Sequence, residues 1–175
     1  HVAYISTTLN NEHSSRVKRC AGLQDEYLQS CPDGSVTVYT KGISSHKELH
    51  VIDVEHQTGY ELAMECLQSS PQVTAMVAIN DMVAYGVMDA LIDSGKRIPE
   101  DISVCGFDNI YPSGFHRVDL TTIEHAIVER GRSSVRLMAE KLYGDSHLMN
   151  SDTITRVEYQ SRLVARGSTG AARTD

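Results

Sequence analysis

Apolar residues in this chain fall alternately into short continuous runs and into longer runs with helical spacing. The clearest case is the stretch 73–109, where an apolar run at 75–79 is followed by helical spacing over 81–94, by Gly95 and by a second apolar run at 103–107. Short apolar runs between polar turns are typical of buried strands, and a glycine after the last periodic residue ends a helix. The stretch therefore predicts a strand, a helix and a second strand.

The rest of the 175-residue chain repeats this alternation. Ser14 or Ser15 can cap a helix that closes at Pro32, and Thr58 can cap another. The other expected elements are strands at 1–5, 36–40, 120–123, 153–157 and 161–165 and a helix at 127–143. Residues 49–54 are interpreted as a strand or a continued crossover, and 168–175 as a disordered tail. Strand and helix alternation indicates an α/β fold with a doubly wound parallel sheet in three αβα layers.

Charge and composition argue against two classes of function. The formal net charge is −7 and the basic residues are scattered, so the chain alone is not expected to bind nucleic acid. No apolar run approaches the roughly 20 residues of a membrane span, and no leader precedes His1, so a cytoplasmic location is expected. The cysteines occur singly without metal or redox spacing and are interpreted as reduced packing residues: Cys20, Cys31, Cys66 and Cys105.

Polar residues gather where the predicted strands end. Asn80, Asp108 and Asp53 are expected at one edge of the sheet, together with the helix turn 15–19 that carries Arg19. In open parallel sheets ligands bind outside the carboxyl ends of the strands. A guanidinium, carboxylates and a carboxamide together offer the donors and acceptors that vicinal hydroxyls need, which favours a polyhydroxy ligand.

Each of these residues also has a simpler interpretation. Asn80 or Asp81 can be the cap of the helix that follows, and Asp108 with Asn109 can form an Asx-turn. Arg19 taken alone is typical of a solvated helix residue. Only the convergence of these residues at one sheet edge favours a ligand site.

Enzyme signatures are missing from the sequence. It contains no GxSxG, P-loop, GxGxxG or HExxH motif. His46 and His50 have the spacing of a metal-ligand pair on a helix, but strand-like runs and Gly42 around them favour a loop. We therefore expect no catalytic residues, no metal and no cofactor.

Several motifs resemble the effector-binding core of LacI/GalR-family bacterial transcriptional regulators. The most specific are TAMVAINDMVAYGVMDAL, GKRIPEDISVCGFDN, LTTIEH and SRLVARGST, with weaker support from RCAGLQDEY and DVEHQTGYELAMECL. Together they extend along nearly the whole chain to about Thr169.

This resemblance implies two similar α/β subdomains, related to periplasmic sugar-binding proteins, that close on an effector. The cleft residues that it implies by motif are Arg19, Ser15, His13, Asn80, Asp108 and His125. Val54 stands where several relatives have an aromatic ring, which makes a purine effector less expected than a sugar. The stretch between Pro32 and Asp53 is long for the family, so the positions of Asp53 and Val54 in the cleft stay open.

The resemblance also implies a division of the chain. Residues 1–124 correspond to the second subdomain, 125–158 to a segment of the first, and 159–167 to a strand that returns to the second. The DNA-binding head, the hinge helix and most of the first subdomain are expected to be absent. The helix 127–143 would then lack its native partner, so we expect it to pack on the chain's own core, to swap into a neighbouring copy or to be poorly ordered.

The sequence therefore predicts the effector-binding and dimerisation module of a homodimeric regulator that senses a sugar and reaches operator DNA only through a separate head. The expected dimer surface, whose residues could equally be core, contains Met82, Tyr85, Met88, Phe115 and His116. Two alternatives are a solute-binding receptor of a sugar transport system and a regulator core controlled by a phosphocarrier protein.

Overall fold

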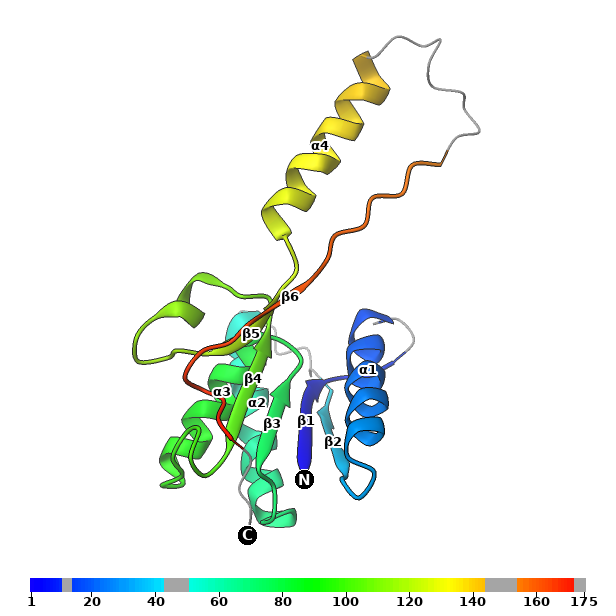
Figure 1. Ribbon diagram of the computed structural model, residues 1–175. Helices are drawn as coiled ribbons and strands as arrows, with labels where there is room; N and C mark the ends of the chain where they lie inside the picture. Colours follow the sequence, from blue (N-terminus) through cyan, green and yellow to red (C-terminus); the bar gives the residue numbers. More distant parts are fainter. Residues whose placement is uncertain (11–13, 43–50, 144–153, 172–175) are drawn as a thin grey trace.

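A six-stranded sheet in the order β2-β1-β3-β4-β5-β6 forms the centre of the molecule (Figure 1). The structure is a computed structural model that describes all residues except 11–13, 43–50, 144–153 and 172–175. Five strands are parallel and the last is antiparallel to its neighbour: β1 (Val2–Thr7), β2 (Val36–Lys41), β3 (Ala75–Ala78), β4 (Ser103–Phe107), β5 (Thr121–Glu124) and β6 (Arg162–Val164).

Helices cover the two faces of this sheet. Helix α1 (Ser14–Ser30) lies beside β1 and β2, whereas α2 (Val51–Ser69) and α3 (Asp81–Asp93) pack against each other on the opposite face (Figure 1). A short 3-10 helix, η2 (Tyr111–Gly114), follows β4, and α4 (Ile127–Tyr143) follows β5. Strand order and layers confirm the expected doubly wound α/β fold.

Two glycines let α2 and α3 approach to backbone contact. A Cβ on Gly86 would lie 1.9 Å from the carbonyl oxygen of His56, and one on Gly59 would lie 2.1 Å from that of Val83. No side chain fits into such gaps, because interiors are packed near crystal density. The close crossing buries Val83 and Leu62 in the core and fixes the N-terminus of α3 at the sheet edge.

The strand predicted at 49–54 is wrong, because α2 already begins at Val51. Thr58, expected as the helix cap, lies inside α2, where its hydroxyl donates to the carbonyl of Val54 at 2.7 Å. Short apolar runs fit a strand and a buried helix equally well, and Asp53 in the first turn was the helical signal.

Two expectations about the end of the chain are also wrong. Residues 154–157 form no strand, so the part of the expected strand 153–157 that the structure describes is irregular. Ser168 is buried, bonded to the carbonyl of Val104 at 2.7 Å and to the amide of Thr121 at 2.8 Å. The tail is therefore not disordered at Ser168, because these hydrogen bonds hold it against β4 and β5.

Helix α4 extends away from the sheet, and none of its residues is buried (Figure 1). Its apolar side chains are largely exposed: Val135 is 70% exposed, Met138 62% and Leu142 65%. The helix forms over the expected residues, and of the three alternatives for it, packing on the chain's own core does not occur among the described residues. Within the described ranges, no helix combines the length and apolar character needed to cross a membrane.

The α2–α3 crossing predicts opposite effects of two glycine substitutions. Gly86→Ala forces the helix backbones apart and should lower the free energy of unfolding by about 3 kcal/mol. Gly22→Ala, in α1 with nothing within 4 Å of its new methyl group, should raise it by about 0.5–1 kcal/mol. Urea denaturation measures both, and equal effects would contradict the close crossing.

Candidate functional site

Arg19 of α1 is held across the carboxyl edge of the sheet by three contacts. One Nη1–H donates to the carbonyl of Ile79 at 2.8 Å, and Nη2 lies 3.8 Å from Asp108 Oδ1. The guanidinium carbon lies 3.6 Å from the centre of the Phe107 ring. A cation stacked on an aromatic face keeps its plane fixed, so the remaining N–H groups of Arg19 have a defined direction.

Asp108 lies at the centre of this cluster. Its Oδ1 also accepts a hydrogen bond of 3.0 Å from His125 Nε2, and the His125 ring lies 5.4 Å from the Phe107 ring. Within the described residues, Oδ2 has no hydrogen-bond partner. Burial raises the pKa of the Asp108 carboxyl, and the neighbouring Arg19 and His125 act in the opposite direction.

The Asn80 side chain makes two hydrogen bonds within the chain. Its Oδ1 accepts from the Val83 amide at 2.9 Å, so it is the N-cap of α3, and its Nδ2 donates to Glu55 Oε2 at 3.0 Å. The cap interpretation is therefore confirmed. The amide retains one N–H and one lone pair for a ligand.

Sequence reasoning missed Glu55 and Arg16, which extend the polar edge towards α2. Glu55 is 9% exposed, and its Oε1 lies 3.6 Å from Arg16 Nη2. Arg16 also donates to the hydroxyl of Thr7 at the end of β1. Arg16 and Glu55 are 39 positions apart, so no local sequence pattern pairs them. The predicted helix also began at Thr58, which left Glu55 outside it.

The other predicted residues divide into three groups. Ser15 is exposed one helical turn before Arg19, and Asp53 is exposed in the first turn of α2, without a hydrogen bond to the cluster. His13 lies outside the described residues, as do His46 and His50. On the expected dimer surface Phe115 is 47% exposed and His116 is exposed, but Met88 is 8% exposed and belongs to the core.

The four cysteines are all free. Cys20 and Cys66 are buried, and burial raises the pKa of both thiols. Burial also raises the pKa of Cys105 to about 11. Cys31 is exposed, so the packing interpretation fails for that residue. Across the described residues, no group of histidine, cysteine or acidic side chains could hold a metal ion.

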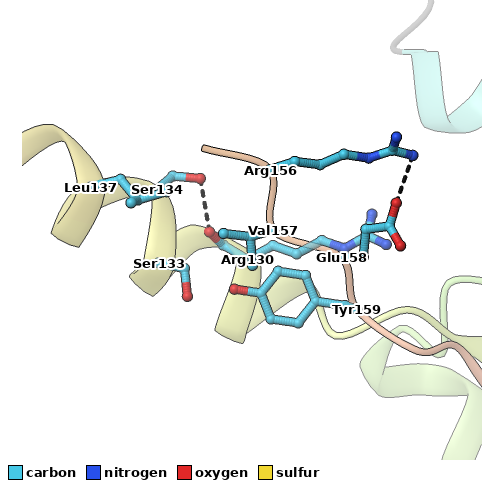
Figure 2. A pocket seen from close by; sticks show the side chains of 8 residues that line it. All are labelled: Arg130, Ser133, Ser134, Leu137, Arg156, Val157, Glu158 and Tyr159. Atoms are coloured by element: carbon cyan, nitrogen blue, oxygen red, sulfur yellow. Dashed lines mark hydrogen bonds and ion pairs between the residues drawn. The ribbon is translucent and has the colours of Figure 1, made fainter. Parts of the chain in front are cut away.

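A separate cavity lies between α4 and the returning segment 156–159 (Figure 2). Its volume is about 660 Å³, and Arg130, Ser133, Ser134, Leu137, Arg156, Val157, Glu158 and Tyr159 line it. Arg156 pairs with Glu158 at 2.6 Å, and Arg130 lies 5.8 Å from the Tyr159 ring. This cavity exists because two segments leave the sheet side by side, and it shares no residue with the Arg19 cluster.

Comparison with known proteins identifies the family. A family model described as a periplasmic binding protein-like domain matches residues 1–169. The chain belongs to this periplasmic binding protein-like family. Its sheet edge is therefore the kind of edge at which this fold forms a cleft.

Individual relatives of this periplasmic binding protein-like chain are regulators. The HTH-type transcriptional repressor PurR of Glaesserella parasuis is 31% identical over 139 residues, which are 78% of this chain and 41% of that protein. A LacI family regulator from Arthrobacter sp. FB24, solved with lactose, is 28% identical with a TM-score of 0.73 over 97% of this chain and 57% of that one. The Lac repressor bound to ONPG is 25% identical with a TM-score of 0.71, over 97% and 45%.

These similarities confirm the resemblance to the effector-binding core of LacI-family regulators. The chain spans less than two thirds of the length of each of these relatives.

The raised pKa of Asp108 predicts a pH-dependent effect of Asp108→Asn. A carboxyl whose pKa is higher in the folded than in the unfolded state contributes most to stability when protonated, and this contribution is lost as the pH rises through the folded value. Asp108→Asn removes the ionised form, so its free energy of unfolding should exceed that of the wild type increasingly from acid to neutral pH. Denaturation at several pH values measures this difference, and a constant difference would contradict the burial of the charge.

Proposed function

We propose that this chain is part of the effector-binding core of a LacI-type transcriptional regulator that senses a sugar or a related small molecule. The observation that supports this most is the ion pair between Arg19 and Asp108 at the carboxyl edge of the sheet, with the Arg19 guanidinium stacked on Phe107. A lactose complex of a regulator that is 28% identical supports the sugar class.

The chemistry of the cluster suits a ligand with neighbouring hydroxyl groups. Each hydroxyl donates one hydrogen bond and accepts others. The free Oδ2 of Asp108 would accept from one hydroxyl while an N–H of Arg19 donates to the next. Because the two groups are charged and half-buried, these hydrogen bonds are stronger than those between neutral groups.

The proposed cleft has a second wall supplied by the rest of a longer protein. We assign residues 1–124 to one subdomain, residues 125–158 to the other, and residues 159–167 to a final strand that returns to the first of these two. The exposed apolar face of α4 supports this assignment, since about 25 cal/mol is gained for each Å² that a partner sheet would remove from water. In this proposal the regulator acts in the cytoplasm, catalyses no reaction and contacts operator DNA through a separate head.

Self-association is proposed through the surface formed by Met82, Tyr85, Phe115 and His116, here called the α3 surface. The rings of Phe115 and Tyr111 pack edge to face at 5.1 Å, and Tyr111 is 85% exposed. Large exposed aromatic side chains are typical of interfaces. Tyr111 was not among the residues predicted from sequence.

The binding proposal predicts a large effect of Arg19→Ala. In the longer protein that carries both walls, calorimetric titration with lactose, galactose, ribose and a purine base should find one sugar that binds, and the substitution should weaken its binding by about 100-fold. Arg97→Ala is the matched control, because Arg97 is exposed, pairs with Asp101 and has no contact with the Arg19 cluster among the described residues. If a purine base binds and no sugar does, the sugar class is wrong.

The dimer proposal predicts that substitutions on α4 and on the α3 surface have different effects on self-association. In this chain the double variant Met138→Glu/Leu142→Glu removes contacts through α4 and should still dimerise, because the α3 surface is intact. Adding Phe115→Glu should give a monomer. Light scattering coupled to size exclusion measures the mass, and a strictly monomeric double variant at high concentration would refute dimerisation through the α3 surface.

A further inference from the structure

Asp81 is a fully buried carboxylate whose three side-chain hydrogen bonds all run to other elements. Its Oδ2 accepts from the Ile110 amide at 2.9 Å and from the Ser113 hydroxyl at 2.6 Å. Its Oδ1 accepts from the Thr122 hydroxyl at 2.6 Å. The carboxylate therefore joins the first turn of α3 to the loop after β4 and to β5.

These bonds hold both sides of an unusual turn. Asp108 has φ of 116° and Asn109 has φ of 50°, values that cost free energy for residues other than glycine. The Asp108 amide is bonded to β5 at 2.8 Å, and the Asn109 amide donates at 3.3 Å to the same Thr122 hydroxyl that Asp81 binds. Since Ile110 is also bonded to Asp81, the direction of the Asp108 side chain depends on this carboxylate.

Gly106 gives Asp81 its place beneath β4. A Cβ on Gly106 would lie 2.3 Å from Asp81 Oδ1, so only glycine leaves room for the carboxylate. The same strand supplies Phe107, on which Arg19 stacks. The carboxylate and the candidate site thus share one strand.

The second end of the network reaches the α3 surface. Ser113 has one hydroxyl hydrogen, which it gives to Asp81, so in its contact of 2.7 Å with Tyr85 the Tyr85 hydroxyl is the donor. Tyr85 lies one helical turn after Asp81. Asp81 therefore positions the Tyr85 ring through the Ser113 hydroxyl.

We propose that Asp81 is a positioning residue, whose buried carboxylate sets the turn that presents Asp108 to the ligand cleft and, through Ser113, the ring of Tyr85 on the α3 surface. The proposal rests on the proposed function only in assigning Asp108 to the ligand. Its structural part is testable in this chain without any ligand.

Asp81→Asn is the main test, followed by NMR of the chain itself. An asparagine keeps one acceptor for Ile110 and Ser113, while its NH₂ group faces Thr122, whose hydroxyl must turn away. The Asn109 amide should then exchange with solvent about tenfold faster. The Asp108 carboxyl should titrate at lower pH, because the negative charge of Asp81, which raises the pKa of Asp108, is lost.

Ser113→Ala is the matched control, because it keeps the charge of Asp81 and its bond to Ile110. It should leave the Asp108 titration unchanged and shift the Tyr85 ring resonances, which Asp81→Asn should shift less because its amide oxygen still accepts from Ser113. If Asp81→Asn does not fold, the nearly isosteric Thr122→Val provides the test, with about tenfold faster Asn109 exchange expected.

Unchanged Asp108 titration and Asn109 exchange in Asp81→Asn would overturn the proposal, as would unchanged Asn109 exchange in Thr122→Val. In the longer protein, Asp81→Asn should also weaken the sugar bound by the wild type about tenfold. If the wild type binds no sugar, the proposed function fails and the NMR results still decide the role of Asp81.

Discussion

The stacking of Arg19 on Phe107 connects helix α1 to the carboxyl edge of the sheet and holds a positive charge beside Asp108. Because the guanidinium also binds the Ile79 carbonyl and lies beside Asp108, one side chain links the ends of β3 and β4. His125 completes the group from the end of β5. A charge held in this way keeps its direction without a ligand, which lowers the entropy that binding would cost.

Two features of Asp108 at this edge lower the free energy of unfolding. Burial raises the pKa of Asp108, so its ionised form is disfavoured in the folded chain even beside Arg19. The same residue occupies a backbone conformation that costs free energy. Natural proteins often accept such costs where a side chain serves binding, and the buried Asp81 network is what holds the turn.

Sequence pattern predicted the elements with strong periodicity and clear caps. The helix over 81–93 was predicted because Asn80 before it, Gly95 after it and the apolar spacing between them agree. Apolar spacing alone predicted the strand 103–107 and the helix 127–143. The start of α2 was missed because the apolar residues of 49–54 fit the spacing of a strand as well as that of a helix. The Arg16–Glu55 pair was missed for the same reason, since Glu55 lies in the first part of α2. The burial of Asp81 and the contacts of Ser168 depend on loops that meet only in the folded chain.

Helix α4 and the Arg19 cluster support the same proposal: α4 has an exposed apolar face, and the polar edge of the sheet is proposed as one wall of a ligand cleft. The most direct test is hydrogen exchange of the longer protein with and without the sugar that it binds best. The proposal predicts protection concentrated at residues 15–19, 79–81, 107–109 and 123–125. Protection confined to the α3 surface or to the groove beside α4 would contradict it.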